Sequence, residues 1–162
     1  METSEIIAIC AAIIALSATG VSIWQGYLNR RHFRLSVKPH LTVHWKNFSD
    51  EPVSFTLTNN GLGPAVIKSF ILEVEGNLFE KEKTAIYHAA LGELGLSGVY
   101  DVDTYAPTKG EAYAVGSSLP LLTFTNSTEI YDQLFIALPK LKFKITYTSM
   151  YDEEEYQYYG NC

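Results

Sequence analysis

Histidines offer the first candidates for chemistry in this sequence. His40 and His44 fall on one side of an expected strand, and imidazole nitrogens bind metal ions at about 2.0 Å. Four residues of extended chain span about 13 Å, which is too far for the two rings to share one ion. His88 lies among apolar residues in an expected helix, where a structural role is commoner than that of a base. We therefore expect no metal site and no cofactor.

Acidic and glycine-rich stretches also lack the spacing of known binding loops. Asp101 and Asp103, and the run 152–155, do not match the residue pattern of a calcium loop. The two glycines of Asn-Gly-Leu-Gly-Pro-Ala at 60–65 are not followed by the Lys-Ser/Thr of a phosphate loop. The common hydrolase motifs and a nucleophilic cysteine within the domain are missing as well. The sequence predicts turns at these places and favours a protein that is not an enzyme.

Charge limits the partners that the chain can bind. The segment 35–162 contains nine lysines and sixteen acidic residues, so its formal charge is −7, and we expect no nucleic-acid partner. A local exception is the alternating set Lys140, Lys142 and Lys144, expected on one face of a strand. These lysines either contact an anion or an acidic partner, or form a solvated strand face that protects an edge.

The N-terminal part of the chain is apolar and uncharged between Glu5 and Arg30. At about 1.5 Å per helical residue, the stretch 6–29 is long enough to cross a hydrocarbon core of about 30 Å. A cleavable signal peptide, with Ala-Leu-Ser-Ala at 15–18 as its cleavage site, and a buried core helix are the alternatives. A signal peptide would begin with basic residues, whereas this one begins with acidic residues. We expect a transmembrane helix.

The basic residues after this stretch predict its orientation. Arg30, Arg31 and Arg34 lie in a basic linker, 30–38, and no Lys or Arg precedes the apolar run. The positive-inside rule then places residues 1–5 outside and the domain that follows the linker in the cytoplasm. The same arginines are candidates for contact with lipid headgroups. Trp24 and Tyr27 are expected at the headgroup level.

Small residues recur at every fourth position of the expected transmembrane helix. Such stripes let helix backbones approach closely in lipid, so they favour a homo-oligomer, although small residues are also simply tolerated in membrane helices. The first stripe is Ala11, Ala15 and Thr19, and the neighbouring one is Ala18, Ser22 and Gly26.

The rest of the chain, 39–162, has the pattern of a β domain. Aromatic residues make up 13% of the sequence, and apolar residues alternate with polar ones in several stretches. Apolar residues at helical spacing predict helices at 80–95, ending at Gly95, and from a cap among 126–128 to Pro139. Cys10 and Cys162 lie outside the expected core, which leaves no disulfide framework. Strands are expected at 40–48, 53–60, 65–74, 100–106, 111–124, 140–151 and 156–160.

Seven or eight short strands with two helical connections favour an antiparallel β-sandwich of immunoglobulin-like arrangement, with a partly open barrel as the alternative. The layout resembles a loose group of small bacterial single-pass membrane proteins with a cytoplasmic β domain. The likeness lies in an N-x-G-x-G-P-A turn at 59–65 and a Y-x-x-x-Y-D hairpin at 147–152. Antiviral membrane effectors that respond to nucleotide messengers share the plan of an anchor and a cytosolic sensor.

Taken together, these features predict a non-enzymatic membrane protein whose cytoplasmic β-sandwich recognises a protein partner or a small ligand, as an oligomer. The alternative is a signal- or nucleotide-gated effector of antiviral defence that disrupts the membrane. Membrane lipid is an expected partner in both cases.

Overall fold

The computed structural model divides the chain into two compact units, Met1–Ser36 and Val37–Cys162. The structure describes residues 2–46, 52–80, 84–96, 101–125, 131–151 and 154–160.

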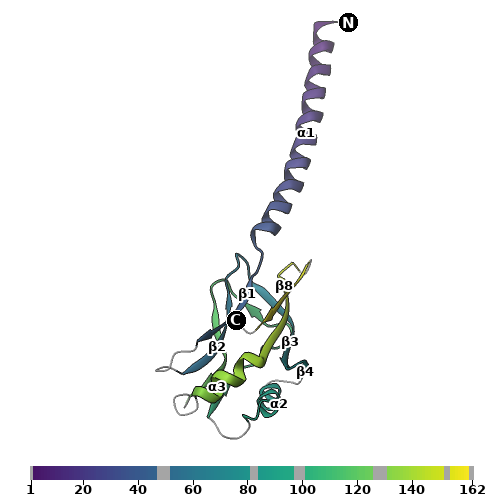
Figure 1. Ribbon diagram of the computed structural model, residues 1–162. Coiled ribbons are helices and arrows are strands. Elements are labelled where there is room, and N and C mark those ends of the chain that lie inside the picture. Colours follow the sequence, from purple (N-terminus) through teal and green to yellow (C-terminus); the bar gives the residue numbers. More distant parts are fainter. Residues whose placement is uncertain are drawn as a thin grey trace. The chain divides into compact units, whose positions relative to one another are not determined.

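The first unit is a single helix, α1 (Thr3–Ser36) (Figure 1). It is long and apolar enough to cross a membrane, and none of the apolar stretch that could do so is buried. Three hydroxyl groups in its more polar half donate hydrogen bonds to the carbonyl four residues earlier, as helix hydroxyls commonly do. These donors are Ser17 (2.8 Å), Thr19 (2.9 Å) and Ser22 (2.8 Å). With their hydroxyls satisfied internally, these residues are compatible with an apolar environment.

The second unit contains two antiparallel sheets. The first has the order β1-β2-β7-β5, and the second has the order β4-β3-β8-β9, with β6 paired to β3. The strands are β1 (Leu41–Lys46), β2 (Val53–Asn59), β3 (Ala65–Val74), β4 (Asn77–Phe79), β5 (Val102–Thr104), β6 (Ala112–Tyr113), β7 (Ser118–Phe124), β8 (Leu141–Ser149) and β9 (Glu155–Gly160).

The two sheets bury their apolar faces in one shared core. Every second residue of β2 and β8 is buried, as expected for strands with one solvent-facing side. Phe55 of the first sheet and Phe143 of the second lie in contact, with ring centroids 5.1 Å apart. Each ring is fully buried, and burying such a side chain contributes about 1.5–3 kcal/mol. The expectation of a mainly β fold with a long N-terminal helix is confirmed.

Two short helices connect the sheets. Helix α2 (Ala85–Glu93) lies between β4 and β5, and helix α3 (Tyr131–Ala137) continues into the 3-10 turn η2 (Leu138–Lys140), which contains Pro139. Both helices were expected at these places. The proposed cap at 126–128 lies outside the described residues.

Two expectations about strands differ from the structure. The stretch 111–124 forms two strands, β6 and β7, because a turn closed by a hydrogen bond from the Ser117 N–H to the Ala114 carbonyl (3.2 Å) interrupts it. The short strand β4 was not expected, because three residues are too few for an alternating pattern. It pairs with the end of β3 across the turn at Glu75 and Gly76.

A fully buried asparagine, Asn59, joins the start of the domain to its own turn and to strand β6. Its side-chain oxygen accepts hydrogen bonds from the N–H groups of His40 (3.2 Å) and Gly61 (3.0 Å). Its side-chain NH2 group donates to the carbonyls of Gly63 (2.9 Å) and Tyr113 (3.1 Å). All four hydrogen-bonding positions of the amide are therefore occupied, as a buried polar group requires.

The two glycines of this motif pack directly against the segment that follows α1. A Cβ atom on Gly61 would lie 2.3 Å from the backbone nitrogen of His40, and one on Gly63 would lie 1.9 Å from the carbonyl oxygen of Val37. Only glycine allows the turn to approach the backbone so closely. The N-x-G-x-G-P-A motif therefore fixes residues 37–40 to the β domain.

We predict that Asn59→Ala destabilises the β domain by on the order of 3 kcal/mol, because it leaves buried N–H and C=O groups without partners. Thermal unfolding of the purified protein in detergent, followed by near-ultraviolet circular dichroism, should show a Tm lower by about 10 °C.

The neighbouring Asn60→Ala is the matched control. Asn60 is exposed, and its amide bonds only to the side chains of Thr42 and His44. The Asn60→Ala substitution should lower the free energy of unfolding by less than about 0.5 kcal/mol. Equal losses of stability in the two variants would contradict a special role for Asn59.

Candidate functional site

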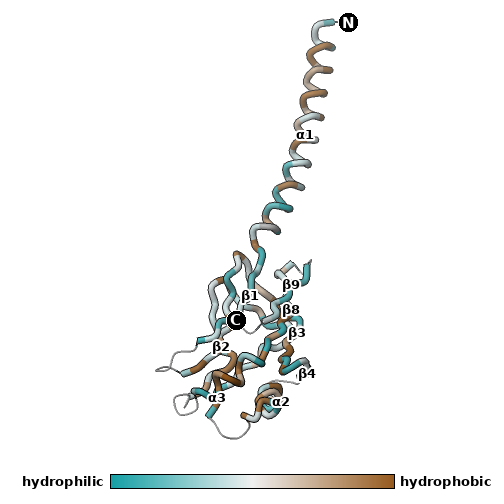
Figure 2. Tube along the Cα trace, viewed as in Figure 1, coloured by the Kyte–Doolittle hydropathy of each residue, from teal (hydrophilic) through white to brown (hydrophobic). Residues whose placement is uncertain are grey.

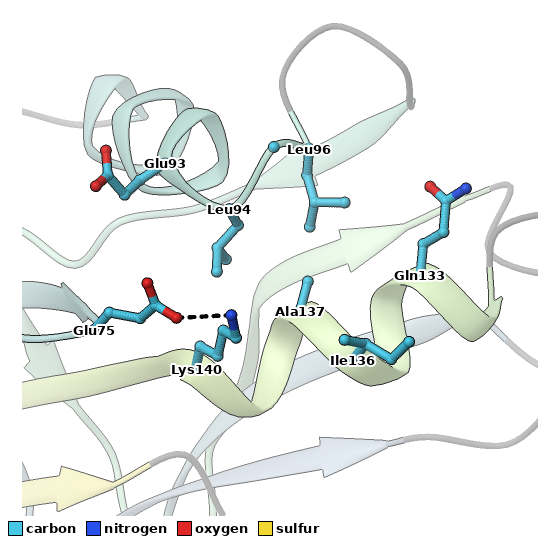
Figure 3. Close-up of a pocket in the computed structure, with 9 residues that line it drawn as sticks. Glu75, Glu93, Leu94, Leu96, Gln133, Ile136, Ala137 and Lys140 are labelled. Carbon is cyan, nitrogen blue, oxygen red and sulfur yellow. Dashed lines mark ion pairs between the residues drawn. The ribbon is translucent and has the colours of Figure 1, made fainter.

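The candidate site is a pocket between the C-terminal end of α2 and helix α3 (Figure 3). Its volume is about 320 Å³. Apolar side chains from both helices form its walls, and polar side chains form its rim. The walls are Leu94, Leu96, Ile136 and Ala137, and the rim is Glu75, Glu93, Gln133 and Lys140.

The end of α2 shapes one side of this pocket. The Leu96 N–H donates to the carbonyl of Leu91 (2.8 Å), and the Gly95 N–H donates to that of Gly92 (3.1 Å), which together form a Schellman motif. Gly95 has a φ of 72°, the left-handed conformation that this motif requires. The chain reverses there, so that Leu96 is buried while Leu94 remains partly exposed. The expectation that Gly95 ends the helix is confirmed.

Charged groups at the rim are already paired within the domain. Lys140 Nζ lies 2.7 Å from a carboxylate oxygen of Glu75, as Figure 3 shows. Glu93 accepts a hydrogen bond from the Asn77 side chain (3.1 Å). Because these groups are largely exposed, the ion pair contributes less than about 1 kcal/mol. Two carboxylates and one lysine give the rim a formal charge of −1, which disfavours an anionic ligand.

Helix α3 extends the apolar surface beyond the pocket. Ile136 is 71% exposed and Phe135 is 54% exposed. The Phe135 ring stacks on Tyr131 at 6.2 Å and lies 6.3 Å from the ring of Trp45. We call the pocket together with the exposed side chains of Phe135 and Ile136 the α2–α3 surface.

The lysines expected to share one strand face are divided between two places. Lys140 precedes β8 and belongs to the pocket rim, whereas Lys142 and Lys144 lie on the outer face of β8. Lys142 lies 3.6 Å from Glu73 on the neighbouring strand and donates to the Tyr159 hydroxyl (3.2 Å), which raises the pKa of the Lys142 ammonium. Lys144 lines a shallow groove on the same face. Two of the three ammonium groups are therefore paired with carboxylates of the same domain.

The candidate residues of α1 are all exposed. They include the two aromatic residues Trp24 and Tyr27 and the basic residues Arg30, Arg31 and Arg34, which lie within the helix because α1 continues to Ser36. The two stripes of small residues are exposed too, and Thr19 and Ser22 use their hydroxyls within the helix. Within the described residues, no group of three His, Cys, Asp or Glu side chains is placed to hold a metal ion.

Sequence reasoning did not find the pocket. Its residues come from the turn after β3, the end of α2 and the residues after it, α3 and η2, and are separated by up to 65 positions, so no local pattern joins them. Among the apolar residues of α3 and η2, Leu134 and Leu138 are buried, while Phe135 is largely exposed.

Comparisons of this chain with protein-family models, with curated proteins and with solved structures found no match. The function is therefore argued from the residues of the chain itself.

We predict opposite effects for two glycine substitutions at the C-terminal end of α2. Gly95→Ala should destabilise the domain by about 1 kcal/mol, because alanine disfavours a positive φ, although a Cβ atom there has open space around it. Gly92→Ala should stabilise it by about 0.5 kcal/mol, because residue 92 is an exposed residue in the last turn of the helix, where alanine is favoured over glycine. Chemical denaturation of the two variants measures both effects, and a loss of stability in both would contradict the helix end described here.

Proposed function

We propose that this chain is a non-enzymatic single-pass membrane protein whose cytoplasmic β-sandwich binds a protein partner through the α2–α3 surface. The observation that carries the binding role is the exposure of Phe135 and Ile136 beside the pocket. The membrane is a bacterial inner membrane, with the N-terminus outside.

Helix α1 supports the membrane anchor. Its large apolar side chains are exposed, and none of the apolar stretch long enough to span a membrane is buried. Figure 2 shows that hydrophobic residues recur along α1. An apolar helix of this length is stable when lipid or other membrane helices surround it. The aromatic residues Trp24 and Tyr27 followed by three arginines fit an exit on the cytoplasmic side.

The strand order supports an immunoglobulin-like sandwich. If β1, β2, β7 and β5 are compared with strands A, B, E and D, the order of the first sheet is that of an immunoglobulin domain. The second sheet, β4-β3-β8-β9, then follows the order C′-C-F-G. Domains of this architecture bind many different partners, so the architecture alone does not define the partner.

The chemistry of the α2–α3 surface favours a protein over a small ligand. A pocket of about 320 Å³ is at the lower limit of those that hold small molecules, and the exposed Phe135, which follows Leu134 and precedes the wall residue Ile136 in α3, adds apolar area outside it. Aromatic side chains surrounded by a polar rim are typical of the central part of protein interfaces. A partner that inserts an apolar side chain between α2 and α3 would cover both parts of the surface.

A nucleotide-gated effector is the second function that the sequence allows. The chemistry of this pocket does not favour it, because among the described residues that line the pocket Lys140 is the only cation, and it is already paired with Glu75. Phosphate groups are normally bound by several cations or backbone N–H groups.

Oligomerisation is proposed through α1. Small side chains let a second helix approach closely in lipid, where packing drives association, and α1 has such side chains at Ala11, Ala15 and Ala18. Because the hydroxyls of Thr19 and Ser22 donate hydrogen bonds within their own helix, these two residues contribute small size to such packing and no hydrogen-bond donor.

A photo-crosslinking residue at position 136 of the full-length protein tests the partner site in native membranes. We expect a discrete adduct with one protein, identified by mass spectrometry. Once that protein is purified, Phe135→Ala should weaken its binding by about 30-fold, because aromatic residues at the centre of an interface contribute on the order of 2 kcal/mol.

Position 78 on β4 is the matched control, since Leu78 is also an exposed apolar residue but lies outside the α2–α3 surface. Equal crosslinking from positions 136 and 78, or none from position 136, would argue against this partner site.

A further inference from the structure

Asn60 and Gly61 form the only Asn-Gly pair in the sequence. In such a pair the backbone nitrogen of glycine can attack the side-chain carbonyl carbon of asparagine, because glycine has no side chain that obstructs the approach. A bond forms between this nitrogen and Cγ, the bond between Cγ and Nδ2 breaks, and ammonia leaves with the proton of the glycine N–H. Water then opens the resulting succinimide ring to aspartate or isoaspartate. Asn60 is exposed, so solvent reaches this pair.

The attacking and the leaving nitrogen of this pair are both engaged in hydrogen bonds in the folded domain. The Gly61 N–H donates to the side-chain oxygen of the buried Asn59 (3.0 Å). The Asn60 side-chain nitrogen, which would leave as ammonia, donates to the Thr42 hydroxyl on β1 (2.7 Å) and lies 3.5 Å from His44 Nε2. The reaction requires that the Gly61 nitrogen loses its proton and that the Asn60 carboxamide turns towards it, so both hydrogen bonds must break first.

The backbone around the pair is fixed as well. The Asn60 N–H donates to the His40 carbonyl (2.8 Å), and the Leu62 N–H donates to the Lys38 carbonyl (2.9 Å). Gly61 packs so closely against this same segment that there is no room for a Cβ atom. The peptide between Asn60 and Gly61 therefore cannot rotate towards the side chain unless the turn first separates from the segment by local unfolding.

We propose that Asn60 is a deamidation site which the buried Asn59 amide keeps unreactive, and that opening of this turn makes the reaction possible. The change is irreversible, because ammonia is lost. Isoaspartate also adds one carbon atom to the main chain between residues 60 and 61, where the close packing against residues 38–40 leaves no space for it. The turn then cannot close as before, and residues 37–40 lose the attachment that it provides.

A second Asn-Gly pair in the same molecule tests this protection. Glu75→Asn creates one in the turn between β3 and β4, where a Cβ atom on Gly76 would have open space around it. The full-length variant is kept in detergent at mildly alkaline pH, and peptide mapping by mass spectrometry follows deamidation at both positions. We expect position 75 to deamidate at least about tenfold faster than position 60. In urea that unfolds the domain, the two rates should become similar.

Asn59→Ala removes the acceptor of the Gly61 N–H, and near-ultraviolet circular dichroism shows whether this variant is folded. In the folded variant, deamidation at position 60 should accelerate at least about tenfold relative to the wild type. If the variant does not fold, the comparison of positions 60 and 75 decides on its own.

Similar rates at positions 60 and 75 in the folded protein would overturn the inference. Two fast rates would mean that the turn gives no protection, and two slow rates would mean that any folded turn protects equally. An unchanged rate at position 60 in folded Asn59→Ala would overturn it too.

Asn60→Asp separates the two consequences of the reaction. This variant carries the negative charge of the product but adds no atom to the main chain. We expect the isoaspartate form, produced in urea and refolded, to have a Tm several degrees below that of Asn60→Asp. Equal Tm values would show that the turn accommodates the longer main chain, which contradicts the loss of attachment of residues 37–40.

Discussion

The buried amide of Asn59 is the interaction on which the arrangement of the β domain depends. It bonds to a backbone group of the segment after α1, to two groups of its own turn and to the carbonyl of Tyr113. Burying the Asn59 amide without hydrogen-bond partners would cost more folding free energy than most single contacts contribute. The four backbone groups that bond to it are therefore held in fixed positions relative to one another. Gly61 and Gly63 then allow the turn to close on residues 37–40. As a result, the entry of the chain into the domain is fixed.

Much of the fold could be predicted from local sequence patterns. The alternation of Val53, Phe55 and Leu57 identified β2 and its buried face, and Gly95 identified the end of α2. The motif around Asn59 was recognised only as a turn. Its role in holding the linker could not be predicted, because the partners His40 and Tyr113 are 19 and 54 residues away and a local pattern contains no such contact.

The candidate site was less predictable than the fold, for the same reason. Phe135 is one of the apolar residues that favour a helix here, yet α3 is only seven residues long and buries Leu134 instead. The alternation of Lys140, Lys142 and Lys144 predicts one strand, whereas Lys140 is the last residue of the 3-10 turn and only the other two belong to β8.

The central claim is that α1 spans the membrane with the β domain in the cytoplasm. The most direct test labels a single cysteine, Leu78→Cys in the Cys10→Ser, Cys162→Ser background, with a maleimide that cannot cross membranes. Position 78 is exposed on the β domain. The account predicts a protein in the membrane fraction whose cysteine reacts only after the cells are permeabilised, while a cysteine at Ser4 reacts in intact cells. A protein in the soluble fraction, or a cysteine at 78 that reacts in intact cells, would contradict it.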